Sequence, residues 1–344
     1  MMTTRPLRFA VFGCGFWSEF QIAAWQEVGG IELVAVYNRT RSKAQAIADR
    51  FGVPAVYDDP EALLAGEQLD FVDIITDVET HCRFVELAAA GKLPVICQKP
   101  MAPDLATAER MAAVCRKGNV PLMIHENWRW QRPIRELRKA LCESGVGRPF
   151  RGRVTFANSF PVFANQPFLA TLDQFILTDM GSHILDAARF LFGEASSLYC
   201  QTRRVTPNIK GEDVATVMMS MGQDVTVTCE MSYASRVEHD RFPETHVFIE
   251  CENGSVELAP DYWLRVTTAA GTTARRCPPH HYPWADPAYD LVHASIVDCN
   301  ANLVAALRGT AVAETAAEDN LKTMRLVFGA YESARTGRSL EPEC

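Results

Sequence analysis

The first 125 residues alternate short apolar segments with helical segments, and no other feature of the sequence restricts the fold as much. The apolar segments, which predict buried strands, are residues 7–13, 31–38, 71–76, 94–99 and 120–125. Helical patterns separate them, and one helix begins at Asp59-Pro60-Glu61, where Asp is the N-cap and Pro the first helical residue. Strands that alternate with helices at this pitch form a parallel sheet with right-handed crossovers. We therefore expect an α/β domain here.

After about residue 150 the pattern changes to longer strands with polar alternation, predicted at residues 151–160, 198–206, 213–221, 225–233 and 247–258. Most of these strands follow one another without a helix between them, and Asn253-Gly254 is a hairpin turn signal. Residues 171–192 and 290–336 are predicted to be helical. The second part of the chain is thus expected to be an α+β domain with a large, mostly antiparallel sheet.

Composition narrows the class of protein. Hydrophobic residues make up 48% and charged residues 22% of the 344-residue chain, which is typical of a folded globular protein. The net charge of −8 argues against nucleic acid as a partner. The 11 cysteines include no C-x-x-C pair, which predicts reduced thiols. Because neither a signal-peptide pattern nor an apolar run of membrane length is found, we expect a cytoplasmic protein that binds no membrane.

A glycine turn follows the first predicted strand directly. Gly13 and Gly15 form a G-x-G motif that opens a helix, and Ser18 stands where the full motif has a third glycine. The first glycine permits a tight turn, the second lets a pyrophosphate approach the backbone, and the helix N-terminus offers free N–H groups to the anion. A plain strand-to-helix turn is the alternative. The position of the motif on the first strand favours a dinucleotide site, with Phe16 and Trp17 among its contacts.

The end of the second strand bears on which dinucleotide binds. A site for NAD usually has an acidic residue here for the ribose, whereas a nearby arginine can accept the 2′-phosphate of NADP. This chain has Asn38 followed by Arg39, with Arg41 close by. On this chemistry NADP is at least as well supported as NAD. We expect Asn38 and Arg39 to contact the cofactor.

Polar residues also follow two further strands at their carboxyl ends, the edge where open α/β sheets bind ligands. Thr76 ends the strand at 71–76, with Asp77 and His81 after it, and Gln98 and Lys99 end the strand at 94–99. Burying an amide or an ammonium in a strand that is covered on both faces costs free energy. We therefore expect these two side chains to leave the core and enter a crevice where a ligand binds. All five residues are therefore predicted cofactor contacts. A surface position for Lys99 is the alternative.

Three segments together resemble the signatures of the Gfo/Idh/MocA family of sugar and cyclitol oxidoreductases. They are Q-K-P at residues 98–100, N-W-R-W at 127–130 before Pro133, and D-x-G-x-H-x-x-D from Asp179 to Asp186. The family has E-K-P at the first segment, so the role of its glutamate does not carry over to Gln98. The likeness covers nearly the whole chain. It implies residues 1–124 as a dinucleotide-binding Rossmann domain and residues 125–344 as an α+β domain for substrate binding and oligomerisation.

The resemblance implies an NAD(P)-dependent dehydrogenase that oxidises a sugar hydroxyl, from a hemiacetal carbon to a lactone. Within the family, several segments are most similar to an enzyme that oxidises a branched pentose with NAD, which favours NAD against the chemistry of Asn38 and Arg39. An inositol or other aldose dehydrogenase of the same family is an alternative. A glycosidase that reduces and reoxidises bound NAD in each cycle is another. A non-catalytic dinucleotide sensor is a weaker alternative, because it needs neither an ammonium nor an imidazole.

The resemblance also implies residue roles. Lys99, His183 and Asp179 are the expected catalytic residues. Neutral imidazole with a pKa near ~6.5 accepts a proton at cytosolic pH, so His183 is the candidate base and Lys99 would stabilise the developing alkoxide. The reverse assignment, with Lys99 as the base, stays open. Substrate contacts are expected from the following residues: Asn127, Trp128, Arg129, Gln166, Asp179 and His183.

No metal site is predicted. His280 and His281 are adjacent rather than four positions apart, and we expect a solvated loop without acidic residues near them. The expected partners are a small-molecule sugar and, by the family resemblance, further copies of the chain in a homodimer or homotetramer.

Overall fold

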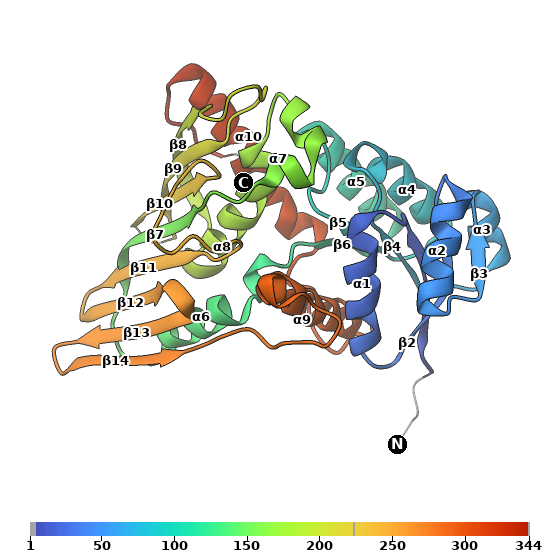
Figure 1. Cartoon of the computed structure of the whole chain (residues 1–344), viewed down its shortest axis with the longest axis horizontal. Coiled ribbons are helices and arrows are strands. Elements are labelled where there is room, and N and C mark those ends of the chain that lie inside the picture. The colour runs from blue at the N-terminus through green and yellow to red at the C-terminus, as the bar shows by residue number, and fades with distance from the viewer. Residues whose placement is uncertain (1–4, 223, 343–344) are drawn as a thin grey trace. The chain divides into compact units, whose positions relative to one another are not determined.

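The alternating segments fold into a six-stranded parallel sheet with the order β3-β2-β1-β4-β5-β6 (Figure 1). The computed structural model describes residues 5–222 and 224–342. Its first six strands are β1 (Leu7–Phe12), β2 (Ile31–Tyr37), β3 (Ala55–Tyr57), β4 (Phe71–Ile74), β5 (Val95–Gln98) and β6 (Leu122–His125). The predicted parallel sheet is confirmed. Strand β3 was not located from sequence, because three residues are too few to show a period.

Five helices connect these strands: α1 (Phe16–Glu27), α2 (Arg41–Phe51), α3 (Pro60–Gly66), α4 (Val78–Ala90) and α5 (Leu105–Gly118). The strand order reverses between β1 and β4, so right-handed crossovers place α1 and α2 on one face and α4 and α5 on the other. The predicted N-cap of α3 is confirmed, since the Asp59 carboxylate accepts a hydrogen bond from the Ala62 N–H at 2.9 Å. In the core, the rings of Phe9 and Phe71 stack with centroids 4.8 Å apart.

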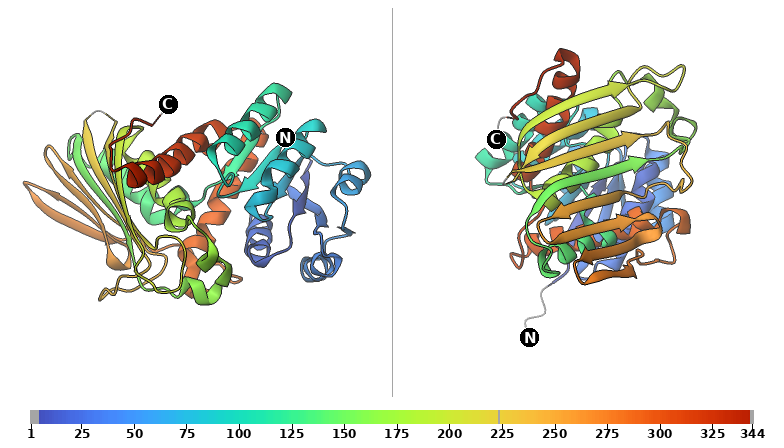
Figure 2. Two further views of the ribbon diagram at one scale, coloured as in Figure 1. Left: turned by 90° about the horizontal axis from the view of Figure 1, so that it is seen from above. Right: turned by 90° about the vertical axis from the view of Figure 1, so that its left-hand side faces the viewer.

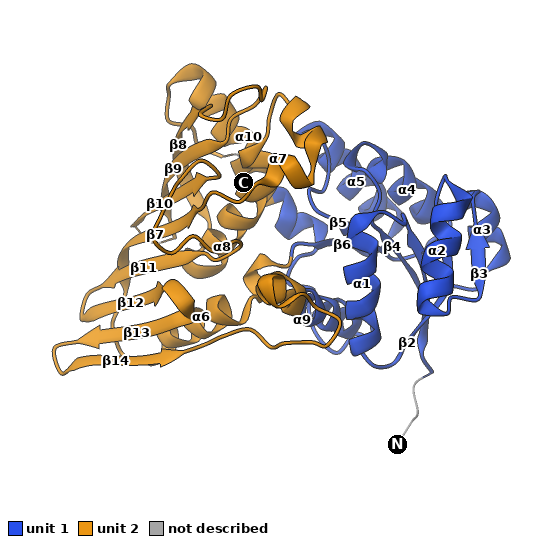
Figure 3. Ribbon diagram, in the orientation of Figure 1, with its two compact units in different colours: residues 1–126, 296–321 blue, residues 127–295, 322–344 orange. Residues whose placement is uncertain are grey.

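The chain divides into two compact units (Figure 3). The first contains the described residues up to Glu126 together with Ile296–Leu321, and the second contains Asn127–Ser295 together with the described residues from Lys322 onward. The prediction of one continuous helical region over 290–336 is wrong in one respect. Two helices form, α9 (Asp290–Leu307) and α10 (Ala317–Thr336), and Gly309 adopts a positive φ of 69° after the first. The domain division at residues 124/125 stays a prediction.

The second unit contains an eight-stranded sheet, whose strands lie side by side in Figure 2. The strands are β7 (Pro149–Ala157), β8 (Ala195–Arg203), β9 (Val214–Met221), β10 (Val225–Ser232), β11 (His246–Cys251), β12 (Gly254–Ala259), β13 (Trp263–Thr268) and β14 (Gly271–Arg276). Strands β7 and β10 pair in parallel and the other neighbours pair antiparallel. The predicted sheet and the hairpin at Asn253-Gly254 are confirmed.

Helices cover one face of this sheet. The helix α6 (Arg132–Glu143) contacts β12 and β13, and α8 (Ser182–Phe192) contacts β7 and β10. Alternation along β9 shows the two faces: Val217 and Met219 are buried, whereas Met218 between them is 50% exposed. The opposite face therefore stays open within the described chain.

The predicted helix over 171–192 begins later than expected. Residues 177–181 form a π-helical turn, Leu177–Gly181, and the regular helix α8 starts at Ser182. The Glu212 carboxylate accepts hydrogen bonds from the backbone N–H groups of Phe175, at 3.3 Å, and Leu177, at 3.2 Å. This tertiary contact binds N–H groups at the helix entrance, and it is not visible in the local sequence pattern.

A buried carboxyl group lies in the core of the first unit. Asp73 on β4 is fully buried, and its Oδ2 accepts hydrogen bonds from Trp25 Nε1 at 2.6 Å and Gln21 Nε2 at 3.1 Å. Burial raises the pKa of Asp73 from 3.8 to about 6, against the opposing effect of these two hydrogen bonds. Folding therefore favours the protonated acid.

This raised pKa makes stability depend on pH. Because the folded state binds the proton more tightly than the unfolded state, stability falls as pH rises through the pKa of about 6. Between pH 4.5 and 7.5 the wild type should lose about 2 kcal/mol of unfolding free energy relative to Asp73→Asn, which cannot ionise. Urea unfolding of both proteins at the two pH values measures this difference. Parallel pH dependence of the two proteins would contradict it.

No helix in residues 5–222 or 224–342 has the length and hydropathy to cross a bilayer.

Candidate functional site

The glycine turn between β1 and α1 has a backbone that only glycine can adopt without strain. Gly13 has a φ of +107°, and its N–H donates to the Tyr37 carbonyl at 2.8 Å. A Cβ atom at this position would lie 2.7 Å from the Ile75 carbonyl oxygen, which is far inside contact distance. At Gly15, by contrast, an added Cβ would meet nothing within 4 Å. The turn is therefore packed on one side and open on the other.

The N-terminus of α1 faces this opening with hydrogen-bond donors. Gly15 is the N-cap and supplies no side-chain cap, and Ser18 Oγ donates back to the Gly15 carbonyl at 2.6 Å. The first N–H groups of the helix are thus available to an anion. Phe16 is 73% exposed at the same point, and Trp17 is half-buried. These features fit the diphosphate of a dinucleotide.

Asn38, just after β2, forms a hydrogen bond with the backbone of the glycine turn. Its Oδ1 accepts a hydrogen bond from the Cys14 N–H at 3.1 Å, and its Nδ2 donates to the Thr40 carbonyl at 3.0 Å. Arg39 is exposed next to it, whereas Arg41 pairs with Asp58 at 3.6 Å. An uncharged amide and an exposed cation therefore occupy the position where a dinucleotide fold recognises the ribose.

The carboxyl ends of β4 and β5 carry the next predicted residues. His81 is buried, with Nε2 3.0 Å from the Thr76 carbonyl and Nδ1 3.3 Å from the Met101 carbonyl. Burial lowers the pKa of His81, which favours neutral imidazole. The ring thereby links the segment after β4 to the segment after β5. Asp77 is the exposed N-cap residue of α4.

Gln98 and Lys99 lie at the end of β5. The Gln98 side chain is buried, and its Oε1 accepts a hydrogen bond from the Lys99 backbone N–H at 3.0 Å. Lys99 is half-buried. Because Gln98 is neutral, it offers this lysine no carboxylate, in contrast to the glutamate of the E-K-P signature.

In the second unit, two predicted residues are in direct contact. The ring of Trp128 stacks on the imidazole of His183 with centroids 4.2 Å apart and an interplanar angle of 21°. Trp128 Nε1 donates to the Thr245 hydroxyl at 3.1 Å, which fixes the indole. Asp179 lies in the π-helical turn one helical turn before His183, and its Oδ2 accepts a hydrogen bond from the Tyr233 hydroxyl at 3.1 Å. π-Helical turns occur frequently at functional sites.

Other predicted substrate contacts are engaged within the fold. Arg129 forms a buried pair with Asp186, with Nε 2.7 Å from Oδ2, and Thr323 Oγ1 donates to the same carboxylate at 3.1 Å. Asn127 is buried and its Nδ2 donates to Ser295 Oγ at 2.9 Å. Gln166 is exposed. Substrate contact by these three predicted residues stays a prediction.

Sequence reasoning did not identify Tyr233 or Glu212. Tyr233 is 54 positions from Asp179, and it lies at the end of a strand with no motif around it. Glu212 precedes β9 in a loop and reaches the entrance of α8. No local period or spacing connects such residues to the motif they contact, so only the tertiary contacts reveal them.

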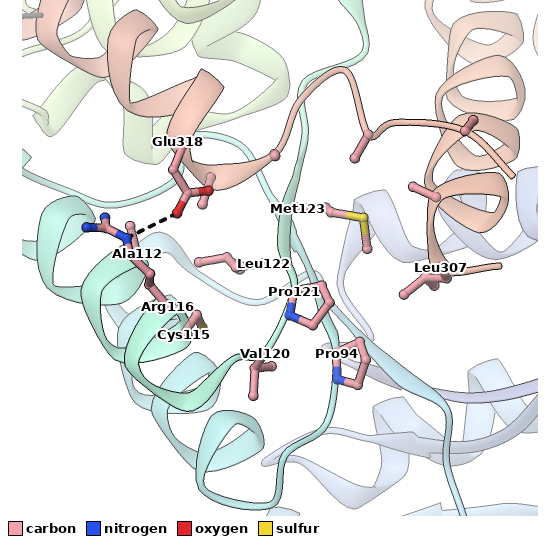
Figure 4. A pocket seen from close by; sticks show the side chains of 15 residues that line it. Pro94, Ala112, Cys115, Arg116, Val120, Pro121, Leu122, Met123, Leu307 and Glu318 are labelled. Atoms are coloured by element: carbon pink, nitrogen blue, oxygen red, sulfur yellow. Dashed lines mark ion pairs between the residues drawn. The ribbon is translucent and has the colours of Figure 1, made fainter. Parts of the chain in front are cut away.

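A cavity of about 330 Å³ lies elsewhere in the first unit (Figure 4). It is lined mainly by alanine, proline and aliphatic side chains near the starts of β5 and β6, and Arg116 pairs with Glu318 at 3.5 Å beside it. The chemistry of open α/β sheets takes place at the other, carboxyl edge. Since none of the predicted site residues lines this cavity, it is not the candidate site.

The loop at His280 and His281 differs from the expectation in one detail. An acidic residue does lie nearby: His281 Nδ1 is 2.9 Å from Asp290 Oδ1, at the start of α9. Asp290 is nine positions away in the sequence and is brought close by the turn of the loop. No group of three His, Cys, Asp or Glu side chains able to hold a metal is found in the described residues.

Two family models match this chain. Residues 7–126 match a model described as "Oxidoreductase family, NAD-binding Rossmann fold". Residues 134–257 match a model described as "GFO/IDH/MocA C-terminal domain". The two matches fall on the parallel sheet and on the larger sheet, respectively.

Curated relatives align over nearly the whole chain. A protein of Paraburkholderia graminis named D-apiose dehydrogenase is 42% identical, over 98% of this chain and 90% of its own length. One of Rhizobium rhizogenes with the same name is 40% identical, over 99% of each chain. Among solved structures, an oxidoreductase from Agrobacterium radiobacter in complex with NAD+, L-tartaric acid and magnesium superposes with a TM-score of 0.95 at 39% identity, covering 97% of this chain and 98% of that one.

Proposed function

We propose that this chain, which belongs to the Gfo/Idh/MocA family, oxidises D-apiose to apionolactone with NAD. The family matches and the relatives named dehydrogenases establish the general activity, an NAD(P)-dependent oxidation of a sugar CH–OH group. The observation that carries the proposal is the identity of 42% and 40% to two proteins named D-apiose dehydrogenase, over 98% and 99% of this chain. The open glycine turn supports a dinucleotide cofactor independently, from geometry.

NAD, when bound, supplies the acceptor for the hydride that leaves the substrate carbon. The proposed task of Gly13, Gly15 and the N-terminus of α1 is to hold its diphosphate, through N–H groups that no side chain caps. Asn38 and Arg39 would lie at the ribose. The carboxyl ends of β4 and β5, with Thr76 and Gln98, would line the rest of the cofactor site.

Oxidation of a hemiacetal to a lactone removes a hydride from carbon and a proton from its hydroxyl group, and a C=O bond forms. We propose that His183 takes the hydroxyl proton and that the Lys99 ammonium stabilises the negative charge developing on that oxygen. Asp179 would hold a substrate hydroxyl or orient His183. Contact with the Trp128 ring restricts the imidazole to one plane, which supports a positioned base.

A screen of free sugars tests the proposal. We expect D-apiose with NAD to give the fastest rise in the absorbance of the reduced cofactor, compared with other pentoses, hexoses and inositols. Faster oxidation of an inositol or a hexose would replace the proposed substrate. Cleavage of an aryl glycoside without net NADH would instead identify a glycosidase.

The choice of cofactor depends on Arg39 in this proposal. Arg39→Ala should lower kcat/KM with NADP by about tenfold or more, because the exposed guanidinium is the cation placed for a 2′-phosphate. The value with NAD should change little. Measuring kcat/KM with both cofactors for both proteins checks this. A greater loss with NAD would show that Arg39 serves the NAD ribose instead.

We also propose that the chain works as a homodimer or homotetramer in the cytoplasm. The open face of the eight-stranded sheet exposes Met218 on β9, which supports association through this face. Nine of the ten described cysteines are buried and all ten are free thiols, which supports a reducing compartment. Sedimentation analysis of the purified protein measures the oligomeric state.

A further inference from the structure

The hydroxyl group of Tyr233 is directed at one of the proposed catalytic residues. It lies 3.1 Å from Asp179 Oδ2 and donates a hydrogen bond to it. Tyr233 follows β10 directly, whereas Asp179 belongs to the π-helical turn before α8, so the contact joins two separate elements of the second unit. The tyrosine side chain is buried, at 6% exposure. A hydrogen bond from a buried hydroxyl to a carboxylate is stronger than a neutral one.

The aromatic ring of Tyr233 is held on several sides. The ring of Phe175 stacks on it with centroids 5.6 Å apart and an interplanar angle of 18°, and Phe156 meets it edge-on at 5.4 Å and 84°. The Tyr233 backbone N–H donates to the Asp213 carbonyl at 3.0 Å. Because packing on both the ring and the backbone restricts rotation, the hydroxyl has a fixed position.

Tyr233 also keeps its proton. Burial and the neighbouring Asp179 raise its pKa well above 10, since both disfavour the phenolate. The hydroxyl therefore remains a donor throughout the pH range in which the protein would work. A donor that does not titrate suits the positioning of a carboxylate.

A second contact holds the backbone that carries Asp179. Glu212 accepts hydrogen bonds from the Phe175 and Leu177 N–H groups and from the Tyr331 hydroxyl, the last at 2.7 Å. Glu212 thus fixes the segment, and Tyr233 contacts the carboxylate itself. One contact therefore positions the backbone near Asp179, and the other positions the Asp179 side chain.

We propose that Tyr233 is a positioning residue for the reaction: its hydroxyl fixes the carboxylate of Asp179 in the orientation that holds a substrate hydroxyl or orients His183. The catalytic part of this inference rests on the proposed function. The contact between Tyr233 and Asp179 is independent of that function.

The test is a cycle of Tyr233→Phe, Asp179→Ala and the double variant, assayed with the sugar and cofactor that the wild type uses. Phenylalanine keeps the ring, so the packing is retained. We expect Tyr233→Phe to lower kcat/KM for the sugar about tenfold or more, with the KM for the cofactor unchanged. In the Asp179→Ala background it should have no further effect. A matched control is Tyr57→Phe, which removes a phenol hydrogen bond to Glu67 of 3.0 Å in the first unit and should leave kcat/KM unchanged.

An equal loss in the Asp179→Ala background would show that the Tyr233 hydroxyl acts independently of Asp179 and would overturn the inference, as would unchanged activity of Tyr233→Phe. Urea unfolding of the same four proteins measures the coupling of the two side chains without any assay of activity. We expect a favourable coupling, and additive effects would overturn the inference. If the wild type oxidises no sugar, the proposed function fails, and the unfolding cycle still decides whether Tyr233 holds Asp179.

Discussion

Replacement of Lys99 by methionine should lower kcat by about two to three orders of magnitude, while the Kd for NAD changes little. Methionine retains a long, unbranched side chain and removes the positive charge. The proposed ammonium stabilises charge that develops on the substrate oxygen during the reaction, and loss of one such preorganised donor costs about 10²–10³ in kcat. Most of the proposed cofactor contacts, above all those of the glycine turn with the diphosphate, come from residues that the substitution does not change. Turnover followed by cofactor absorbance, and Kd from fluorescence titration, measure the two quantities.

The control for this variant is Lys117→Met on α5, which removes the same charge at an exposed position of the same unit. Its kcat should equal that of the wild type. Near-normal turnover of Lys99→Met would remove the lysine from the mechanism.

The second large effect concerns stability. Asp186→Asn should lower the free energy of unfolding by about 3–5 kcal/mol, because it leaves buried arginine charge without its carboxylate. Asp186 is fully buried, its Oδ2 lies 2.7 Å from Arg129 Nε, and Arg189 Nη1 lies 3.7 Å from Oδ1. Asparagine has nearly the same volume, so the loss comes from charge and hydrogen bonding rather than from a cavity. Urea unfolding followed by circular dichroism measures it.

An exposed ion pair provides the comparison. Glu332→Gln removes the partner of Arg335 on the surface of α10, where solvent screens both charges, and the unfolding free energy should barely change. If Asp186→Asn lowers the free energy of unfolding no more than this control does, the buried ion pair does not stabilise the fold as we argue. The contrast matters for the D-x-G-x-H-x-x-D signature, since its last aspartate lies in a structural ion pair.

Local patterns were sufficient for much of the fold. Five of the six strands of the parallel sheet were predictable because each is a short apolar run next to a helical pattern, and the Asp59 cap of α3 needs only neighbouring residues. The glycine turn was predictable for the same reason. Gly13 has to adopt a positive φ where the chain passes the end of β4, and that requirement appears in the sequence as a glycine directly after the first apolar run.

Positions set by distant residues were not predictable in this way. Glu212 binds the N–H groups of Phe175 and Leu177 in the segment before α8, and the hydrogen bond of Tyr233 to Asp179 joins residues 54 positions apart. The three residues at 127–129 looked alike as substrate contacts in sequence. Their side chains differ in the structure: Trp128 stacks on His183, whereas Arg129 pairs with Asp186 and Asn127 donates to Ser295.

Local sequence patterns were enough to establish the α/β order of the first unit, the mostly antiparallel character of the second sheet, the glycine turn and the family resemblance. These depend on periodicity, turn chemistry and short motifs, which act between residues close together in the chain. Which motif residues contact one another, and which pair within the core, became visible in the folded structure alone. Such contacts form between side chains of separate elements that meet only after folding. The strength of a buried charge pair or hydrogen bond then depends on the low dielectric constant of the surrounding protein interior.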